Sequence, residues 1–278
     1  MQDAFAYCGE LVRTTDRDRY IASLFAPVEV RGSLHALYAF NAELARVREV
    51  AREVLPGEIR LQWWADVIGG ERRNEANASP VATALLATIA RHGLSLAVLR
   101  DLIEARRFDL YQEPMRSTSD LESYARKTSS AIISLGARIT AATEAADAAE
   151  PAGIARAIAG LLGALPTHLA RGQLYLPVDL LERYQVQQHD LFAGRSSAGL
   201  EGAAAELRAT ARLHLAAASP HLKALPQAAI PALLPVAVVR PILDRLERSG
   251  ALTPKALSSW RRQLLIWRAA RHPARIAA

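Results

Sequence analysis

Apolar residues recur at intervals of three and four along most of this chain, and this repeat is the feature that most restricts its fold. In the segment 30–47 the residues with this spacing are Val30, Leu34, Leu37, Phe40, Leu44 and Val47. Such spacing places apolar side chains on one face of an α-helix. The same period returns in segments 61–68, 82–89, 96–103, 121–139, 154–169, 200–222, 230–246 and 257–269. No segment alternates as a half-buried strand would, so the sequence predicts an all-α protein.

The interruptions of this repeat predict loops within one domain that spans residues 1–278. A chain of 278 residues is long enough to bury one large core. Helix starts are predicted at Ser119 and Asp120 and at Pro56, Pro80, Pro151 and Pro177. The alanine-rich segment 141–152 and the segment 194–202 are candidate linkers, but helical repeats on both sides favour loops.

The chain is weakly basic, and arginine carries nearly all of its positive charge. It has 34 Lys and Arg against 28 Asp and Glu, and its lysines are Lys127, Lys223 and Lys255. This excess identifies no anionic partner, and we expect no nucleic-acid binding. Hydrophobic residues at 51% and charged residues at 22% predict a soluble globular protein. The single Cys8 excludes an internal disulfide, and no signal segment follows Met1, so we expect a cytoplasmic location.

The common catalytic arrangements are absent from the sequence. It has no Gly-rich phosphate loop, and its seven histidines show no close metal-ligand pairing. Segment 260–268 (WRRQLLIWR) has an apolar and a basic face, and is expected either to dock on the core or to lie on an anionic membrane. In the pair Trp63 and Trp64, one indole should pack inward and the other be half exposed, because neighbours lie about 100° apart around a helix.

Four groups of residues carry a resemblance to a known family. They are segment 31–40 (RGSLHALYAF), segment 61–66 (LQWWAD), segment 101–110 (DLIEARRFDL) with Tyr124, and Gly153, Ala155, Leu162 and Gly172 with segment 175–177 (YLP). In this order, the four groups are similar to four parts of the squalene/phytoene synthase family. These parts are the segment that leads into the first aspartate-rich motif, the helix that contains the Trp-Trp pair, the middle of the chain, and the second aspartate-rich region. The resemblance covers residues 16–185 and implies an isoprenoid synthase-like helical bundle with a central cleft.

The resemblance also implies a reaction whose metal ligands are missing here. In that family, facing carboxylate clusters hold Mg²⁺, which draws pyrophosphate from an isoprenyl diphosphate before head-to-head condensation. The acids of the first motif would fall on Ala45, Arg46 and Glu49, and those of the second on Ala164 and His168. Segment 160–172 contains no Asp or Glu, so Mg²⁺ would lose the oxygen ligands it prefers. We therefore expect no catalytic residue, no metal and no cofactor, and Mg²⁺ only if the chain is an active synthase.

These departures, together with segments 17–24 (RDRYIASL), 40–45 (FNAELA) and 165–168 (LPTH), are similar to the branch of the family that contains a mitochondrial complex I assembly factor. The resemblance implies a non-catalytic role in the assembly of respiratory complex I (NADH:ubiquinone oxidoreductase), with its subunits or assembly intermediates as partners. Two alternatives stay open. One is an active phytoene or squalene synthase, and the other is a protein that binds a prenyl lipid or quinone without turnover. Contact with the inner membrane would be peripheral.

The candidate site residues are the inherited cleft positions. They are Arg31, Asn41, Glu43, Ala45, Arg46, Glu49, Tyr124, Ala164, His168, Arg171 and Tyr175. Arg31 resembles a family arginine near the diphosphate, although capping or pairing within the fold is equally expected. Glu104, Asp109 and Tyr124 are expected to brace helices by hydrogen bonds. His168 and Arg171 are neutral and basic, and would admit an anionic group without a metal.

Overall fold

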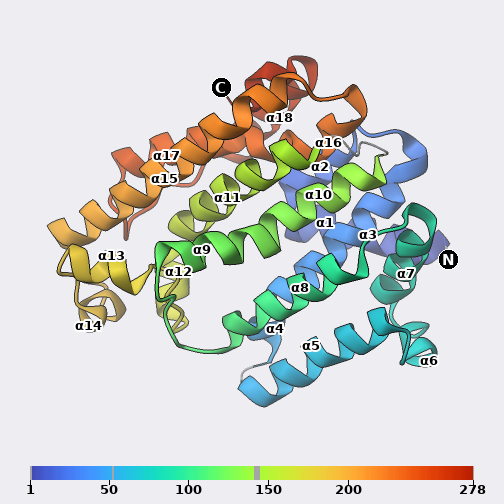
Figure 1. The fold of residues 1–278 in the computed structure, drawn as a ribbon, viewed down its shortest axis with the longest axis horizontal. Coiled ribbons are helices and arrows are strands. Elements are labelled where there is room, and N and C mark those ends of the chain that lie inside the picture. Colours follow the sequence, from blue (N-terminus) through green and yellow to red (C-terminus); the bar gives the residue numbers. More distant parts are fainter. Residues whose placement is uncertain (1, 52, 141–144, 278) are drawn as a thin grey trace.

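The computed structural model describes residues 2–51, 53–140 and 145–277, and within these ranges the chain forms helices and no strand. The all-α prediction is confirmed (Figure 1). The longer helices are α1 (Gln2–Thr15), α3 (Val28–Ala45), α5 (Val54–Gly69), α7 (Pro80–His92), α8 (Leu96–Arg107), α10 (Ala131–Ile139), α11 (Ala146–Gly163), α15 (Ala198–Lys223), α17 (Val239–Arg248) and α18 (Ser259–Arg271). The shorter α-helices are α2 (Arg17–Ser23), α4 (Val47–Val50), α6 (Arg73–Ala76), α9 (Thr118–Ala125), α12 (Leu165–Ala170), α13 (Val178–Arg183), α14 (Gln188–Phe192) and α16 (Ile230–Leu233). Tighter or wider turns form η1 (Phe108–Leu110), η2 (Arg126–Ser130), η4 (Gln227–Ala229), η5 (Leu234–Val238) and η6 (Pro273–Ile276).

Local chemistry explains several helix starts, with two corrections to the sequence predictions. Pro80 opens α7 after the N-cap Ser79, as predicted. Helix α9 begins at Thr118, earlier than predicted, because its N-cap residue is Ser117. The backbone N–H of Ser117 donates in turn to the Asp120 carboxylate at 3.1 Å, which completes a capping box. Pro151 does not start a helix but lies inside α11. The candidate linker 141–152 is therefore helical from residue 146 onward, and residues 141–144 lie outside the described residues.

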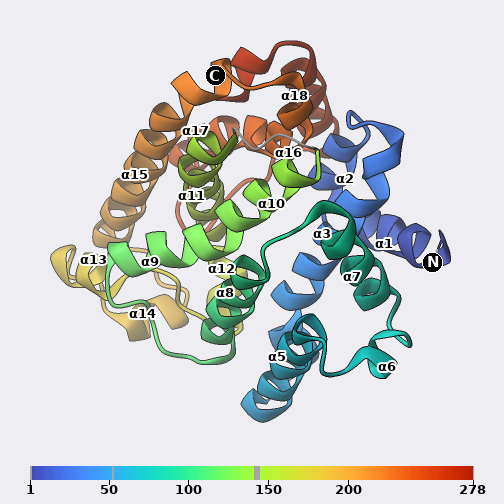
Figure 2. The ribbon, with the colours of Figure 1, turned by 45° about the vertical axis from the view of Figure 1, so that its right-hand side comes forward.

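The buried apolar side chains form two clusters. The first cluster consists of side chains from α11 and from α9, α15 and α17, which pack around it. The second consists of side chains from α3 and from α1, α5, α7 and α8 (Figure 2). Helix α10 contributes Ile133 to the first cluster and Ile132 to the second. Trp64 is fully buried and packs edge-on against Phe40, with ring centroids 4.9 Å apart, whereas Trp63 is half-buried. The prediction for the two indoles is confirmed.

The long predicted helix 121–139 contains one wider turn. Residues Arg126–Ser130 form the π-helical segment η2 between α9 and α10. Gly153 of α11 packs directly on this turn, and a Cβ atom at Gly153 would overlap the backbone of Ser130. The close approach of the two helices therefore requires glycine at this position.

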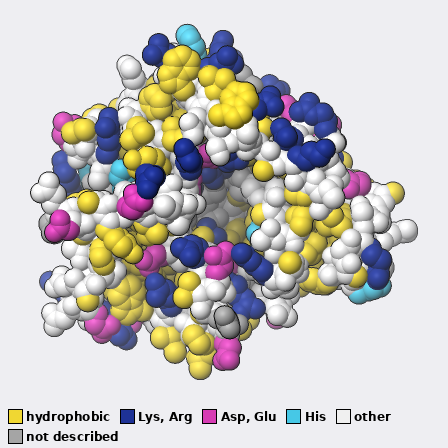
Figure 3. Space-filling model, turned by 180° about the vertical axis from the view of Figure 1, so that it is seen from behind, with side chains coloured by type: hydrophobic (Ala, Val, Ile, Leu, Met, Phe, Trp, Pro, Cys, Tyr) yellow, Lys and Arg dark blue, Asp and Glu magenta, His cyan; other side chains and the backbone are white. Residues whose placement is uncertain are grey.

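The C-terminal helix α18 docks on the core, which is one of the two outcomes expected for segment 260–268. Ile266 and Ala269 are buried, and Arg262 pairs with Asp18 of α2. No helix in the described ranges is long and apolar enough to cross a membrane. Seen from the face opposite to that of Figure 1, the molecule has a hollow near its centre, with basic and acidic side chains on its rim (Figure 3).

Candidate functional site

The residues at the first family motif lie where α3 ends. Ala45 is the last residue of α3, Arg46 links α3 to α4, and Glu49 lies within α4. All three are exposed. Nε of Arg46 lies 3.5 Å from Oε2 of Glu49, so the one carboxylate of this group faces a cation within its own turn.

The residues at the second motif lie at a matching break, between α11 and α12. Pro166 prevents a straight continuation of α11 for two reasons. Proline lacks the N–H that would donate to the carbonyl of Leu162, and the proline ring would clash with that carbonyl. Ala164 lies at the junction between the two helices, with φ −103° and ψ 6°. His168 lies on α12 and packs against Tyr175, with ring centroids 4.7 Å apart.

An ion pair joins these two motif regions. Nη1 of Arg171, which ends α12, donates to Oε1 of Glu49 at 2.6 Å across a sequence separation of 122 residues. The two side chains are 46% and 37% exposed, so this contact alone contributes about 0.2–1 kcal/mol. A protein cation therefore bridges the two regions at which the family resemblance implies a metal.

A buried polar cluster is centred on Asp109 in η1. Oδ1 of Asp109 accepts hydrogen bonds from the hydroxyls of Tyr124 and Tyr175, each at 2.8 Å. Oδ2 accepts from Nη1 of Arg106 at 3.0 Å, and the same nitrogen lies 2.8 Å from the Tyr124 hydroxyl. Nη2 of Arg106 reaches Oδ1 of Asn41 at 3.5 Å. The fold thus brings together the predicted residues Asn41, Tyr124 and Tyr175, and Asp109 braces η1 against α9 as expected.

Burial sets the protonation of this cluster. It raises the pKa of Tyr124 and of Tyr175, and the neighbouring Asp109 raises both further, so both phenols keep the protons that they donate. Burial opposes the charge on Arg106, but Tyr124 and Asp109 outweigh this effect and raise its pKa above the ordinary value. Burial also lowers the pKa of His168, although Asp109 partly offsets the effect. His168 is therefore neutral at pH 7.

The donor set does not fit the Mg²⁺ that the family resemblance implies. Among the carboxylates near the motif positions, Glu43 is held by Arg60, Glu49 by Arg46 and Arg171, and Asp109 by Arg106 and two hydroxyls. A cation there would have to displace arginine from each. In the described part of the chain, no group of three or more His, Cys, Asp and Glu side chains is placed to hold a metal ion.

Two predicted site residues have partners elsewhere. Arg31 donates to the carbonyl oxygens of Ala26 and Leu24, both at 2.8 Å, and so caps the chain that leaves α2. Glu43 accepts from Arg60 of α5 at 2.9 Å and lines an open depression with Trp63. Arg31 is thus a capping residue, the second of its two expected roles.

Sequence reasoning missed two members of the Asp109 cluster. Arg106 precedes Asp109 by three residues, and Gln173 donates to the Asp109 carbonyl at 3.0 Å. The three-residue spacing of Arg106 and Asp109 on a helix was a usable signal. No local sequence signal indicated Gln173, because its partner Asp109 lies 64 residues away.

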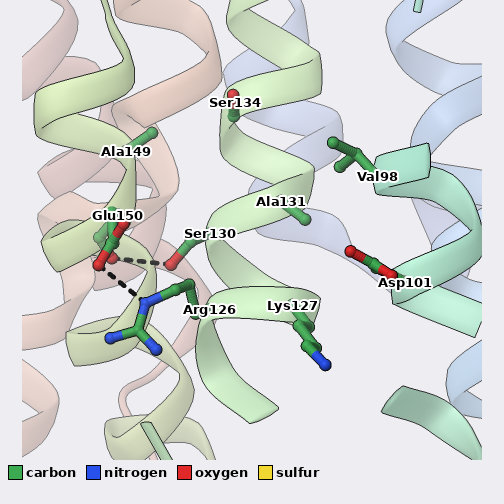
Figure 4. Close-up of a pocket in the computed structure, with 9 residues that line it drawn as sticks. All are labelled: Val98, Asp101, Arg126, Lys127, Ser130, Ala131, Ser134, Ala149 and Glu150. Atoms are coloured by element: carbon green, nitrogen blue, oxygen red, sulfur yellow. Dashed lines mark hydrogen bonds and ion pairs between the residues drawn. The ribbon is translucent and has the colours of Figure 1, made fainter. Parts of the chain in front are cut away.

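A separate groove of about 400 Å³ runs between α8, η2 and α11 and contains none of the predicted site residues. Figure 4 shows Asp101 and Lys127 on its opposite walls, while Arg126 turns aside to Glu150 at 2.8 Å. Its rim carries exposed side chains of both charges, Asp101, Lys127 and Glu150.

Solved structures with this fold define the class of protein. A dehydrosqualene synthase in complex with ligand superposes with a TM-score of 0.80 at 18% identity, covering 98% of this chain and 96% of that chain. The squalene synthase HpnC from Alicyclobacillus acidocaldarius gives a TM-score of 0.73 at 23% identity, covering 91% of this chain and 96% of that chain. The protein therefore has the all-α fold of squalene and dehydrosqualene synthases.

The family follows from the sequence as well. The squalene/phytoene synthase family model matches residues 12–268, and the chain belongs to that family. Among curated relatives, "NADH dehydrogenase (ubiquinone) complex I, assembly factor 6" of Rattus norvegicus is 31% identical over 88% of this chain and 74% of its own length. The human protein of that name is 31% identical over 87% and 73%. The 15-cis-phytoene synthase of Synechococcus elongatus is 21% identical over 70% and 67%.

Proposed function

We propose that this protein acts in the assembly of respiratory complex I and forms no squalene or phytoene. The relatives named as complex I assembly factors, which are 30–31% identical over most of the chain, support the first half. The observation that carries the second half is the Glu49–Arg171 ion pair. A synthase needs facing carboxylates free to hold Mg²⁺, whereas here arginine already neutralises the remaining carboxylate.

The test is a deletion strain of the source organism. Complex I is measured as NADH:ubiquinone activity and as assembled complex on native gels, and terpenoids are measured by mass spectrometry. We expect complex I to fall and terpenoids to stay unchanged. Loss of terpenoids with normal complex I would instead support the synthase alternative.

A double variant tests whether acids restored at the first motif would bring back metal-dependent turnover. The double substitution Ala45→Asp and Arg46→Asp adds two carboxylates beside Glu49, and the pure variant is assayed with Mg²⁺ and farnesyl diphosphate. We expect neither the wild type nor the variant to turn over, because the second motif still lacks an acid at Ala164 and His168. The matched control is Glu29→Asp on the first turn of α3.

We further propose that α18 brings the protein to an anionic membrane surface. Residues 258–277 include five arginines and no acid. Trp260 and Trp267 are 65% and 44% exposed, and the Arg271 guanidinium stacks on Trp267 at 4.6 Å. Exposed indoles beside arginines are typical of helices at a lipid interface. Arg262 takes no part in this surface, because Asp18 holds it.

Vesicle flotation tests this contact. The variant Arg261→Gln, Arg268→Gln should bind vesicles of phosphatidylglycerol and phosphatidylcholine roughly 30-fold more weakly than wild type, at about 1 kcal/mol per charge. The control Arg183→Gln, Arg195→Gln removes equal charge from α13 and the turn after α14 and should bind as wild type does. Equal losses in both variants would mean that only net charge matters.

A further inference from the structure

Helix α5 carries apolar side chains on two opposite faces. Its inward face places Trp64 in the core, while Leu55, nine positions earlier, points to the opposite side of the helix. A helix that is apolar all round is usually covered on every side. Here the described part of the chain leaves the outward face of α5 and the end of α4 uncovered. The exposed side chains are Val50 at 63%, Val54 at 36%, Leu55 at 69% and Ile59 at 62%.

A groove of about 670 Å³ borders these exposed side chains. Its apolar lining consists of Val50, Ala51, Pro56, Ile59, Trp63 and Ala78. Pro56, Ile59 and Trp63 follow one another on α5 at spacings of three and four, so they line the groove along about 10 Å of the helix axis. The groove and the exposed side chains of residues 50–59 are continuous through Val50 and Ile59, and we call them together the α5 surface.

The charged side chains of the groove are already paired within the chain. Glu43 accepts from Arg60 at 2.9 Å, and Glu75 pairs with Arg72 at 3.0 Å. The indole N–H of Trp63 donates to Oε2 of Glu75 at 3.0 Å. A partner can therefore cover these groups without leaving a charge or the indole N–H unsatisfied. An apolar centre with a polar rim is also the usual anatomy of a protein–protein interface.

Charge and position favour a protein over a lipid membrane as the occupant. Segment 43–76 contains seven acids and six arginines, whereas an anionic membrane attracts surfaces with a basic excess. In Figures 1 and 2, α5 lies at the lower edge of the molecule and α18 at the upper edge. With α18 on a membrane, the α5 surface would face away from the lipid.

The size and shape of the α5 surface favour a helix. Its exposed apolar side chains amount to on the order of 400 Å², near the largest patches on monomeric proteins. A standard interface buries about 800 Å² on each partner, of which rather more than half is apolar, so this area suffices for one specific partner. A second copy across a two-fold axis would set one groove against the other, whereas a helix is convex and fills a groove. The described ranges contain no strand that could pair with an extended peptide.

We propose that the α5 surface docks an amphipathic helix of a partner protein. The apolar side chains of that helix would repeat over two turns, at i, i+3 or i+4, and i+7, which matches the length of the groove of about 10 Å. Ile59 and Trp63 line the middle of the groove and would supply the centre of the contact. Only the identity of the partner, a complex I subunit or assembly intermediate, rests on the function proposed above.

Photo-crosslinking in cells of the source organism tests the contact. A photoreactive benzoylphenylalanine replaces Ile59, and as a control it replaces Leu213 of α15, which is 72% exposed. We expect position 59, and not position 213, to crosslink to an amphipathic helical segment of a complex I subunit or assembly intermediate, identified by mass spectrometry. Crosslinks only to lipid or to a second copy, or none above the control, would overturn the proposal. A crosslink to an amphipathic helix of a protein outside complex I would uphold the surface and overturn only the identity of the partner.

A double variant measures the strength of the contact. The crosslinked segment, made as a fluorescent peptide, should bind Leu55→Gln, Ile59→Gln at least about tenfold more weakly than wild type in anisotropy titrations. The control Leu213→Gln removes an equally exposed leucine and should bind as wild type does. Both variants should melt as wild type does, because glutamine is a good helix former and the replaced side chains are exposed.

The same variants separate this proposal from the proposed function. In the deletion strain, the double variant should fail to restore complex I, whereas Leu213→Gln should restore it. Normal complex I after deletion, with the peptide still bound by wild type and lost by the double variant, would end the assembly function and leave the docking surface standing. Unchanged peptide affinity in the double variant, an equal loss in Leu213→Gln, or a clearly lower melting temperature of the double variant would overturn the docking surface.

Discussion

Replacement of Asp109 by Asn should be the most destabilising single change near the motif positions. The Asp109 side chain is 7% exposed and that of Arg106 is 15% exposed. Asn keeps the size of Asp but removes the negative charge that balances Arg106. It also removes an acceptor from hydrogen bonds with Tyr124, Tyr175 and Arg106.

The magnitude follows from this burial. Breaking a buried ion pair by removing one partner costs about 3–5 kcal/mol, because the remaining charge stays desolvated. For a chain of this size the melting temperature should fall on the order of 10 °C. Tyr175→Phe removes one hydrogen bond to the same carboxylate and should cost only about 1–2 kcal/mol. The exposed pair of Glu104 and Arg107 provides a control, since Glu104→Gln should cost at most about 0.5 kcal/mol.

Urea unfolding followed by circular dichroism measures these differences. The order of loss should be Asp109→Asn, then Tyr175→Phe, then Glu104→Gln. The double variant Asp109→Asn, Tyr175→Phe should cost less than the sum, because both changes disrupt one network. A loss for Asp109→Asn no larger than that for Glu104→Gln would refute the assignment of the cluster as a buried brace.

Three further outcomes are expected from the same unfolding assay. Arg171→Gln should cost about 0.2–1 kcal/mol, and the loss should shrink in high salt; a loss that salt does not change would contradict a half-exposed ion pair. Burial lowers the pKa of His168 and of His35, so the unfolded chain binds more protons than the folded chain, and stability should be full above about pH 6.5 and fall below it. His168→Gln should flatten this slope, and an unchanged slope would exclude His168 as its source. Gly160→Ala should stabilise by about 0.5–1 kcal/mol, because a Cβ there meets nothing within 4 Å, whereas Gly153→Ala on the same helix should destabilise by about 1–3 kcal/mol. Equal effects of these two changes would contradict the close approach of α11 to η2.

The sequence predicted those parts of the fold that depend on local order. The three- and four-residue repeat located most of the long helices, since burial of one helical face needs only that spacing, but the predicted segments did not include α1. The absence of acids between residues 160 and 172 was likewise visible without a structure. A predicted helix boundary was wrong where two residues could each act as the N-cap, as with Ser117 and Ser119 at the start of α9.

The parts that could not be predicted depend on contacts between distant segments. The partner of Arg171 lies 122 residues away: the family resemblance implies that the two motif regions face each other, but no local pattern pairs Arg171 with Glu49. Arg31 could not be assigned to its capping role until the path of the chain after α2 was known. The pairing of Arg262 with Asp18 was hidden for the same reason, since 244 residues separate the two.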